Sequence, residues 1–353
     1  MDIASVFTKY KPIVERALEK YLPRTVTNDY LAWLLGKPRF AYDVDAFQKA
    51  ITNPIWDFLD RGGKRWRPIF MFITAKAFGA DVEKLKDFSV IPEFAHNGSI
   101  IVDDIEDQGQ LRRGKPCMHH LFGTDIAINA GNFLYFLPSI VLSKNKDIPE
   151  EQRLRAYELF CQEMTNIHLG QGTDIHWHKG QAETIEEKQY LQMCSYKTGC
   201  LARMAARLGV ILAGGTPEQE AAMGRIGEAV GVAFQIQDDI LSASATGEFA
   251  KRKGYGDDIT EGKRTLIVLQ TLKKAPETEK KRLLEILNKH TTDEPLITEA
   301  LTILQKHGGI EYSREKAKAL VDEALKEAIP LIPNKDAAEE YEAFIRYMIE
   351  RKI

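Results

Sequence analysis

Two clusters of aspartates lie in apolar stretches of the sequence, where carboxylates are uncommon. The first is Asp103-Asp104-Ile-Glu-Asp107, and the second is the pair Asp238-Asp239. Basic residues follow each cluster in the sequence. Carboxylate oxygens are ligands that Mg²⁺ prefers, and Mg²⁺ in proteins is often shared with substrate phosphates. The pattern therefore predicts a site for Mg²⁺ and phosphate.

The first cluster has helical spacing. On a helix, Asp103 and Asp107 stack on one face and Asp104 lies beside them. Three adjacent carboxylates repel one another, and the apolar residues before them argue against a fully hydrated surface. A divalent cation would remove the repulsion. A solvated acidic patch at a helix end remains the alternative interpretation.

Two arginines come soon after the first cluster. Arg112 and Arg113 are expected to lie one to two turns further along the same helix, before Gly114 and Pro116 end it. Guanidinium groups match phosphate oxygens in a bidentate geometry, so paired arginines beside a magnesium site suit a diphosphate. The alternative is ion pairing with the acidic residues of the preceding turns.

The second cluster offers fewer carboxylates. Gln235 precedes its two aspartates by one turn on the same side, and Ser242 stands where a third carboxylate could lie. Lys253 and Lys263 follow, with the acidic pair Asp257-Asp258 between them. A loop of this composition could close over a phosphate, and an ordinary charged turn is the alternative.

A third basic motif lies nearer the N-terminus, in the segment Gly62-Gly-Lys64-Arg-Trp-Arg67-Pro68. Two glycines followed by a proline predict a loop that enters a helix, since proline fits the first helical turn. The N-terminus of a helix attracts anions, and Lys64 and Arg67 would add charge to it.

The elements that must position these residues are helices. Apolar residues recur at three- and four-residue spacing from about residue 6 to residue 328, and alternating β-branched runs are almost absent. We expect an all-α protein with a single helical domain over residues 46–353, preceded by an N-terminal helical segment at 1–45. No linker or short repeat interrupts the domain.

Bulk composition excludes several classes of protein. A net charge of −3 and a hydrophobic content of 44% are typical of soluble globular proteins and show no basic excess for nucleic acid. Apolar runs are expected to be interrupted by charge or proline, which predicts no membrane span. Charged residues near Met1 argue against a signal peptide. The four cysteines lack zinc or redox spacing, which favours the reducing cytoplasm.

Taken together, the motifs resemble those of the trans-type prenyl diphosphate synthases, the polyprenyl synthetase family, over roughly residues 50–350. The resemblance is strongest to archaeal and bacterial geranylgeranyl-type members. It rests on these segments in this order: GGKRWRP, the His96-Asn pair, DDIEDQGQLRRGKP, GQGTD, KTG, FQIQDD and KGYGDDITEGK. It implies an antiparallel helix bundle around a deep central cavity, a homodimer, and three Mg²⁺ held at the cavity mouth.

The resemblance also implies roles for particular residues. The metal ligands would be Asp103, Asp104, Asp107, Asp238 and Asp239. The cations that bind the allylic diphosphate would be Arg112, Lys197, Lys253 and Lys263. The residues that bind isopentenyl diphosphate would be Lys64, Arg67, His96 and Arg113. The residues that line the allylic cation would be Thr198 and Gln235, with Gln171 and Asp174 near them.

The implied reaction is a head-to-tail condensation. The allylic diphosphate ionises, the isopentenyl double bond attacks the cation, and the released diphosphate removes the proton. Mg²⁺ and cationic side chains would stabilise the departing diphosphate. Two positions depart from the family pattern. Ser242 replaces an aspartate that many members carry, and Asn132 replaces a common aspartate that could support the first acidic helix.

Product length is expected to depend on the helical turns that precede Asp103. In the family, bulky aromatics four or five residues before this aspartate stop elongation at farnesyl. Here Ser99 and Gly98 occupy those positions, and Ala95 lies one turn deeper, so the cavity should stay open. The predicted product is geranylgeranyl diphosphate or longer. The floor, or alternatively ordinary core, would be formed by Phe133, Tyr135 and Phe136.

Two other functions fit parts of the pattern. A class I terpene cyclase shares the first motif, and Asp238 and Ser242 have the spacing of its second motif, but Thr246 stands where that motif needs glutamate. A regulatory subunit of a heteromeric synthase is the second alternative, although such subunits usually lose the aspartates that this chain keeps.

Overall fold

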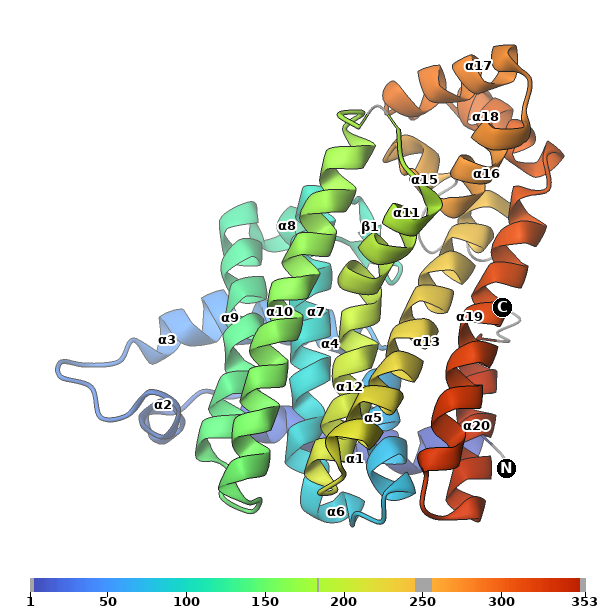
Figure 1. Ribbon diagram of the computed structural model, residues 1–353. Coiled ribbons are helices and arrows are strands. Elements are labelled where there is room, and N and C mark those ends of the chain that lie inside the picture. Colours follow the sequence, from blue (N-terminus) through green and yellow to red (C-terminus); the bar gives the residue numbers. More distant parts are fainter. Residues whose placement is uncertain (1–2, 183, 245–255, 350–353) are drawn as a thin grey trace. The chain divides into compact units, whose positions relative to one another are not determined.

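The computed structural model describes residues 3–182, 184–244 and 256–349 and is almost entirely helical (Figure 1). This confirms the predicted all-α class. Its residues group into two compact units. The first comprises residues up to Leu159 together with Leu208–Gly215, and the second comprises Phe160–Arg207 and the chain from Thr216 onward.

The first unit holds the N-terminal half of the chain. Its helices include α1 (Ile3–Tyr21), α2 (Asn28–Leu35), α3 (Val44–Phe47), α4 (Asn53–Asp60), α5 (Trp66–Ala77), α6 (Val82–Leu85), α7 (Val90–Glu106), α8 (Met118–Phe122) and α9 (Thr124–Lys144). The π-helix η1 (Gln48–Thr52) and the 3₁₀-helix η2 (Lys86–Ser89) connect some of them. The long helix α10 (Glu150–His178) has residues in both units.

The N-terminal helix α1 is part of this packing. Val14 and Leu18 are fully buried, and Tyr10 packs against Phe72 of α5 with ring centroids 5.6 Å apart. The Tyr21 hydroxyl donates to Asp87 at 3.1 Å, which ties the end of α1 to η2. Residues before the predicted boundary at 45 therefore contribute to the core of the first unit.

The helices α7 and α9 form the closest pair of this unit and run side by side (Figure 1). They meet at two glycines. A Cβ atom on Gly98 would lie 2.9 Å from the Gly131 carbonyl oxygen, and one on Gly131 would lie 2.7 Å from the Val102 side chain. Any larger residue at either position would push the two helices apart.

Among the described residues, α9 is the one helix long and apolar enough to cross a bilayer by length and composition alone. Residues 126–143 contain no charged side chain, and Pro138 interrupts them, as expected for the longest apolar runs. In the structure α9 packs against α7, α8 and η1, and 44% of its most apolar window is buried. A core helix of a soluble protein meets the same criterion, so the observation is weak evidence for a span.

The second unit holds the C-terminal half. Its elements include α11 (Glu187–Cys194), the π-helix η3 (Ser195–Gly199), α12 (Cys200–Leu212, continuing into the first unit), α13 (Pro217–Ser244), α15 (Asp257–Thr260), α16 (Leu266–Lys274), α17 (Glu277–Asn288), α18 (Glu294–Lys306), α19 (Gly309–Ala328), η4 (Ile329–Leu331) and α20 (Lys335–Ile349). The buried helix α13 packs along α19 (Figure 1). The helical run formed by α11 and α12 is interrupted by the π-helix η3 between them.

The expectation that Arg112 and Arg113 lie on the first acidic helix was wrong. The helix α7 ends at Glu106, and a two-stranded hairpin follows, with β1 (Leu111–Arg112) antiparallel to β2 (Lys115–Pro116). Both Arg113 and Gly114 adopt positive φ in the turn, at 54° and 76°. A hairpin of two-residue strands carries no alternating pattern, so periodicity could not reveal it.

Candidate active site

The first acidic cluster lies at the C-terminal end of α7, as its spacing predicted. The Asp107 backbone N–H donates to the Asp103 carbonyl at 2.8 Å, which places these residues one turn apart. Asp104 is 1% exposed, and its Oδ1 accepts from Arg112 Nε at 2.7 Å. Its Oδ2 is buried and has no hydrogen-bond partner within the described part of the chain.

Charge and burial act in opposite directions on this carboxylate. Burial raises the pKa of Asp104, and the neighbouring guanidinium of Arg112 opposes that rise. A buried oxygen without a partner, beside two further carboxylates, fits a divalent cation. The described residues contain no group of three His, Cys, Asp or Glu side chains close enough to cage a metal. A cation here would need oxygens from substrate or water, which is how Mg²⁺ is commonly held.

The two arginines have different partners. Arg112 is bound to Asp104, whereas Arg113 donates to the Gly62 carbonyl at 2.6 Å and to the Asn97 side chain at 3.2 Å. Burial lowers the pKa of Arg113 to about 10, and the charges of Arg65 and Arg112 add to that effect. The hairpin turn thus sends one guanidinium toward the acidic cluster and the other toward the glycine loop.

The glycine loop carries the third basic group. The helix α5 begins at Trp66, so Lys64 lies in the loop before it, as predicted. Arg67 Nη1 lies 3.0 Å from His96 Nε2. Burial and the charge of Arg67 hold the pKa of His96 well below its usual value, so the ring is neutral and its Nε2 accepts from Arg67. The first unit therefore brings Arg67, His96 and Arg113 near one another, and Lys64 lies in the glycine loop that Arg113 contacts.

In the second unit, the π-helix η3 carries Lys197 and Thr198. Lys197 Nζ lies 2.6 Å from Asp174 Oδ2 of α10, and both side chains are largely buried. Burial by itself would raise the pKa of Asp174, but the charges of Lys197 and Lys263 outweigh it and the pKa is lowered. The π-helix thus holds a charged ammonium group against a charged carboxylate.

A chain of hydrogen bonds connects Thr198 to the second acidic cluster. The Thr198 hydroxyl donates to Gln235 Oε1 at 2.8 Å, and Gln235 Nε2 donates to Asp239 Oδ1 at 2.9 Å. The Tyr190 hydroxyl donates to the other oxygen of Asp239 at 2.8 Å. Both oxygens of Asp239 are therefore oriented by protein donors, whereas Asp238 is half-buried on the same helix, α13.

Behind Asp239 lies a pocket whose lining includes Ser242, Asp258 and Lys263. Burial raises the pKa of Asp239 to about 7, with the charge of Asp258 as the next cause. Two carboxylates this close favour a cation between or beside them. From the sequence, Asp258 is expected in a loop that could close over a phosphate, and it is not among the predicted metal ligands. The sequence signal for a site role was that Asp258 lies between Lys253 and Lys263.

Some predicted residues are placed differently or lie outside the structure. Gly98 and Ala95 are buried in the packing of α7, and Gly98 contacts α9 directly. Ser99 is half-buried, and Asn132 is exposed on α9. Lys253 lies outside the described residues. Gly98 is therefore small because two helices meet there, a reason that spacing alone did not suggest.

Comparison with known proteins relates the chain to one family. A family model described as polyprenyl synthetase matches residues 48–304. A short chain isoprenyl diphosphate synthase from Methanothermobacter thermautotrophicus is 33% identical over 291 residues, covering 82% of this chain and 87% of that protein.

Solved structures show the same fold. Geranylgeranyl pyrophosphate synthetase from Pyrococcus horikoshii matches with a TM-score of 0.81 and 30% identity, covering 99% of this chain and 98% of that one. A geranylgeranyl pyrophosphate synthase from Corynebacterium glutamicum, complexed with isoprenyl diphosphate and magnesium, matches with a TM-score of 0.79 and 22% identity over 98% and 99% of the two chains.

Proposed function

This chain belongs to the polyprenyl synthetase family and is a prenyltransferase of the trans-prenyl diphosphate synthase type, and from that premise we propose that its product is geranylgeranyl diphosphate or longer. The observation that supports the diphosphate chemistry is that each unit holds its own acidic cluster next to basic side chains, whereas product length is argued below from α7. The first unit has Asp104 with Arg112, and the second has Asp258 with Lys263.

We propose that the metal is Mg²⁺, with three ions per site. The ligands would be Asp103, Asp104, Asp107, Asp238 and Asp239. The partnerless oxygen of Asp104 supports this assignment, as does the magnesium in the Corynebacterium glutamicum structure. We add Asp258, because it shares a pocket with Asp239. When bound, the ions would neutralise charge developing on the departing diphosphate.

The two substrates would use different basic groups. Isopentenyl diphosphate would bind to Lys64, Arg67, His96 and Arg113 in the first unit. A neutral His96 suits this role, because it accepts from Arg67 and leaves its other ring nitrogen as a donor to phosphate. The allylic diphosphate would bind to Arg112, Lys197, Lys253 and Lys263.

The chain's own polar groups would then control the cation. Thr198 and Gln235 would place oxygen dipoles beside it, since their mutual hydrogen bond fixes the direction of both side chains. Lys197 would hold the departing diphosphate, which takes up the proton lost after bond formation. Apolar walls would exclude water that otherwise quenches the cation to an alcohol.

The comparisons favour a synthase over both alternatives. The matching family model and the relatives above are synthases, and the isopentenyl-binding residues would have no role in a terpene cyclase. A regulatory subunit would not need the oriented carboxylate of Asp239. The assay described below distinguishes these cases directly.

Product length would depend on Ser99 rather than on Gly98. Gly98 contacts α9 through its backbone, so it has no free space around it for a growing chain. Ser99 is half-buried on the next position of α7, and its hydroxyl donates to the His96 carbonyl at 2.8 Å. The small side chains of Ser99 and Ala95 would leave room past farnesyl length.

Replacing Ser99 with phenylalanine is expected to shorten the main product to farnesyl diphosphate, because the ring would block elongation. Replacing Gly98 with alanine should instead lower the free energy of unfolding by about 1–3 kcal/mol through overpacking against α9, with little change in product length. Chromatographic sizing of dephosphorylated products and denaturant unfolding would measure both effects, with Ser99→Ala as the matched control. Wild-type product length in Ser99→Phe would contradict the assignment.

We propose that the chain forms a homodimer through the exposed face of α9. Ile128 is 43% exposed and Phe136 is 72% exposed on a helix face that lacks charge between Asp125 and Lys144, so Phe136 is neither core nor cavity floor within this chain. Exposed apolar side chains that gather on one face are typical of association surfaces. Light scattering after size exclusion should give twice the chain mass of 40.0 kDa. A mass of one chain at micromolar concentration would contradict the dimer.

We further propose a cytoplasmic location, in keeping with four cysteines that form no disulfide. The division into a segment at 1–45 and a domain at 46–353 stays a proposal, although α1 lies within the core of the first unit.

The decisive experiment incubates the purified chain with Mg²⁺, isopentenyl diphosphate and, separately, dimethylallyl, geranyl and farnesyl diphosphates. The expected result is a ladder of prenyl diphosphates ending at geranylgeranyl length or beyond. Cyclic hydrocarbons would indicate a cyclase. No product with any starter, followed by activity after addition of a second homologous chain, would indicate a regulatory subunit.

A further inference from the structure

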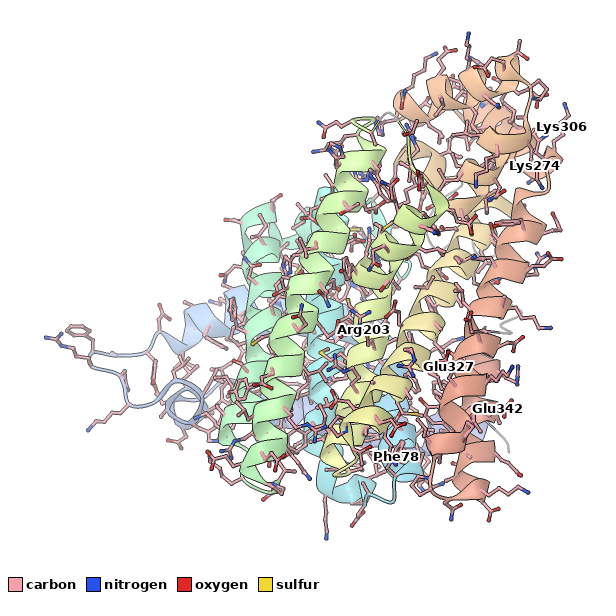
Figure 2. The ribbon with its side chains drawn as sticks, viewed as in Figure 1. Phe78, Arg203, Lys274, Lys306, Glu327 and Glu342 are labelled. Atoms are coloured by element: carbon pink, nitrogen blue, oxygen red, sulfur yellow. The ribbon has the colours of Figure 1, made fainter. Side chains whose placement is uncertain are left out.

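A group of buried and half-buried charges lies among α10, α12 and α13 within the second unit, separate from the acidic clusters. It comprises Glu163, Arg203, Arg207, Glu220 and Glu228, with the Ser195 hydroxyl bonded among them. Its centre is Arg203, which lies on α12 and is labelled in Figure 2. Arg203 donates to Glu163 of α10 in a bidentate geometry, from Nε at 2.7 Å and from Nη2 at 2.6 Å. The side chain of Glu163 is 0% exposed.

The remaining guanidinium nitrogen of Arg203, Nη1, bonds to Ser195 of the π-helix η3 and to Glu228 of α13. It donates to Ser195 Oγ at 3.1 Å and to Glu228 Oε2 at 2.8 Å. The Ser195 hydroxyl in turn donates to Glu228 Oε1 at 2.8 Å. Ser195 is the first residue of η3, and Arg203 lies on the helix that follows it. The π-helical turn that carries Lys197 and Thr198 is therefore held at its start, where Ser195 bonds to Glu228, and Arg203 of the following helix bonds to the same serine.

Around this turn the backbones touch without intervening side chains. A Cβ atom on Gly170 of α10 would lie 2.2 Å from the Lys197 backbone nitrogen. One on Gly231 of α13 would lie 2.6 Å from the Gly199 Cα atom. A small rotation of α12 would therefore move Lys197 and Thr198 directly, since no flexible side chain can absorb it.

Stability alone does not account for this arrangement. Buried ion pairs add little net stability, because desolvation offsets their attraction, and a well-packed apolar core would serve as well. What a bidentate arginine adds is a defined geometry. π-helical turns are rare and concentrate at functional sites, where they change the direction of side chains.

We propose that Arg203 is a positioning residue for Lys197 and Thr198, and that its bonds to Glu163, Glu228 and Ser195 set the rotation of the π-helix that carries them. The inference rests on the function proposed above for those two residues. Arg203 does not touch substrate. It acts on the allylic side of the reaction only, because the two residues it positions, Lys197 and Thr198, are assigned to the allylic substrate.

Three variants test this role at graded severity. Arg203→Lys keeps the positive charge but loses the bidentate guanidinium bond to Glu163. Glu228→Gln keeps the side-chain shape but removes a negative charge. Ser195→Ala removes one hydroxyl and leaves every charged pair intact. The control is Arg225→Gln, which breaks the exposed pair of Arg225 on α13 and Glu327 on α19. Of the two, Glu327 is labelled in Figure 2. We would measure circular dichroism, binding of the non-ionising analogue farnesyl thiodiphosphate with Mg²⁺, the KM for each substrate, and the fraction of farnesyl diphosphate released as alcohol.

The Arg203→Lys and Glu228→Gln chains are expected to fold. They should bind the analogue at least about 10-fold more weakly, since the charge-assisted contact of Lys197 with the diphosphate is misplaced. The alcohol fraction should rise, and the KM for isopentenyl diphosphate should stay within about twofold of wild type. Folded variants with unchanged analogue binding and alcohol fraction would overturn the proposal. If both charged-residue variants unfold, Ser195→Ala decides by the same criteria. Analogue binding needs no turnover, so an inactive wild type would refute the proposed function without deciding this inference.

Discussion

Replacing Asp103 with alanine is expected to lower kcat/KM by at least about 100-fold while leaving the fold intact, because one preorganised group that stabilises transition-state charge is worth about this much or more. Asp103 is half-buried at the end of α7, one turn from Asp107. Removing one of three adjacent carboxylates relieves their repulsion, so unfolding free energy should not fall. Steady-state kinetics over a Mg²⁺ series, with circular dichroism, would measure both.

The matched control for Asp103 is Glu106→Ala. Glu106 is exposed in the same turn of α7 but is not one of the expected ligands. It should stay within about threefold of wild type, as for most surface substitutions away from a site. The concentration of Mg²⁺ needed for half-maximal activity should rise in Asp103→Ala and not in the control. Near-wild-type activity of Asp103→Ala would falsify the metal assignment.

The second large effect concerns the ion pair of Lys197 and Asp174. Lys197→Met is expected to abolish most activity and to lower the free energy of unfolding by about 3–5 kcal/mol, because it leaves a buried carboxylate without its partner. The two groups are 2.6 Å apart, and Asp174 is only 5% exposed. Adding Asp174→Asn should restore much of the stability, since the uncompensated charge is gone. It should not restore activity, because the ammonium group for the allylic diphosphate is still missing.

Low pH should remove the contribution of this ion pair to the free energy of unfolding. The pKa of Asp174 is lowered in the folded protein, so the unfolded state takes up a proton more readily. The pair therefore stabilises the fold above the unfolded pKa of about 4, and this contribution is lost as the pH falls below it. Denaturant unfolding between pH 3 and pH 7 should show a smaller acid loss in the double variant. Equal slopes for wild type and double variant would contradict the predicted role of the pair.

The features that were predicted correctly are determined by residues close together in the sequence. Three aspartates at i, i+1 and i+4 share one face of any helix, so the position of the first cluster at the end of α7 follows from helical geometry. Two glycines before Trp66 and a proline after it determine where α5 begins. The all-α class follows in the same way, because each helix has its own apolar periodicity.

The elements that were missed depend on contacts between distant segments. Arg112 and Arg113 look alike in the sequence, yet a hairpin turn directs one to Asp104 and the other to Gly62. Asp258 becomes part of a candidate site only because a neighbouring helix brings Asp239 to the same pocket.

The amino-acid sequence alone was enough to predict the helical class and the family, because apolar periodicity and the order of short motifs are properties of the chain. The tertiary structure decided the rest. It showed that Gly98 is small because α7 meets α9 there, and that Lys197 lies on a π-helix whose first residue, Ser195, bonds to Glu228 and Arg203. Such contacts join residues far apart in the chain, and no local pattern records which segments will meet.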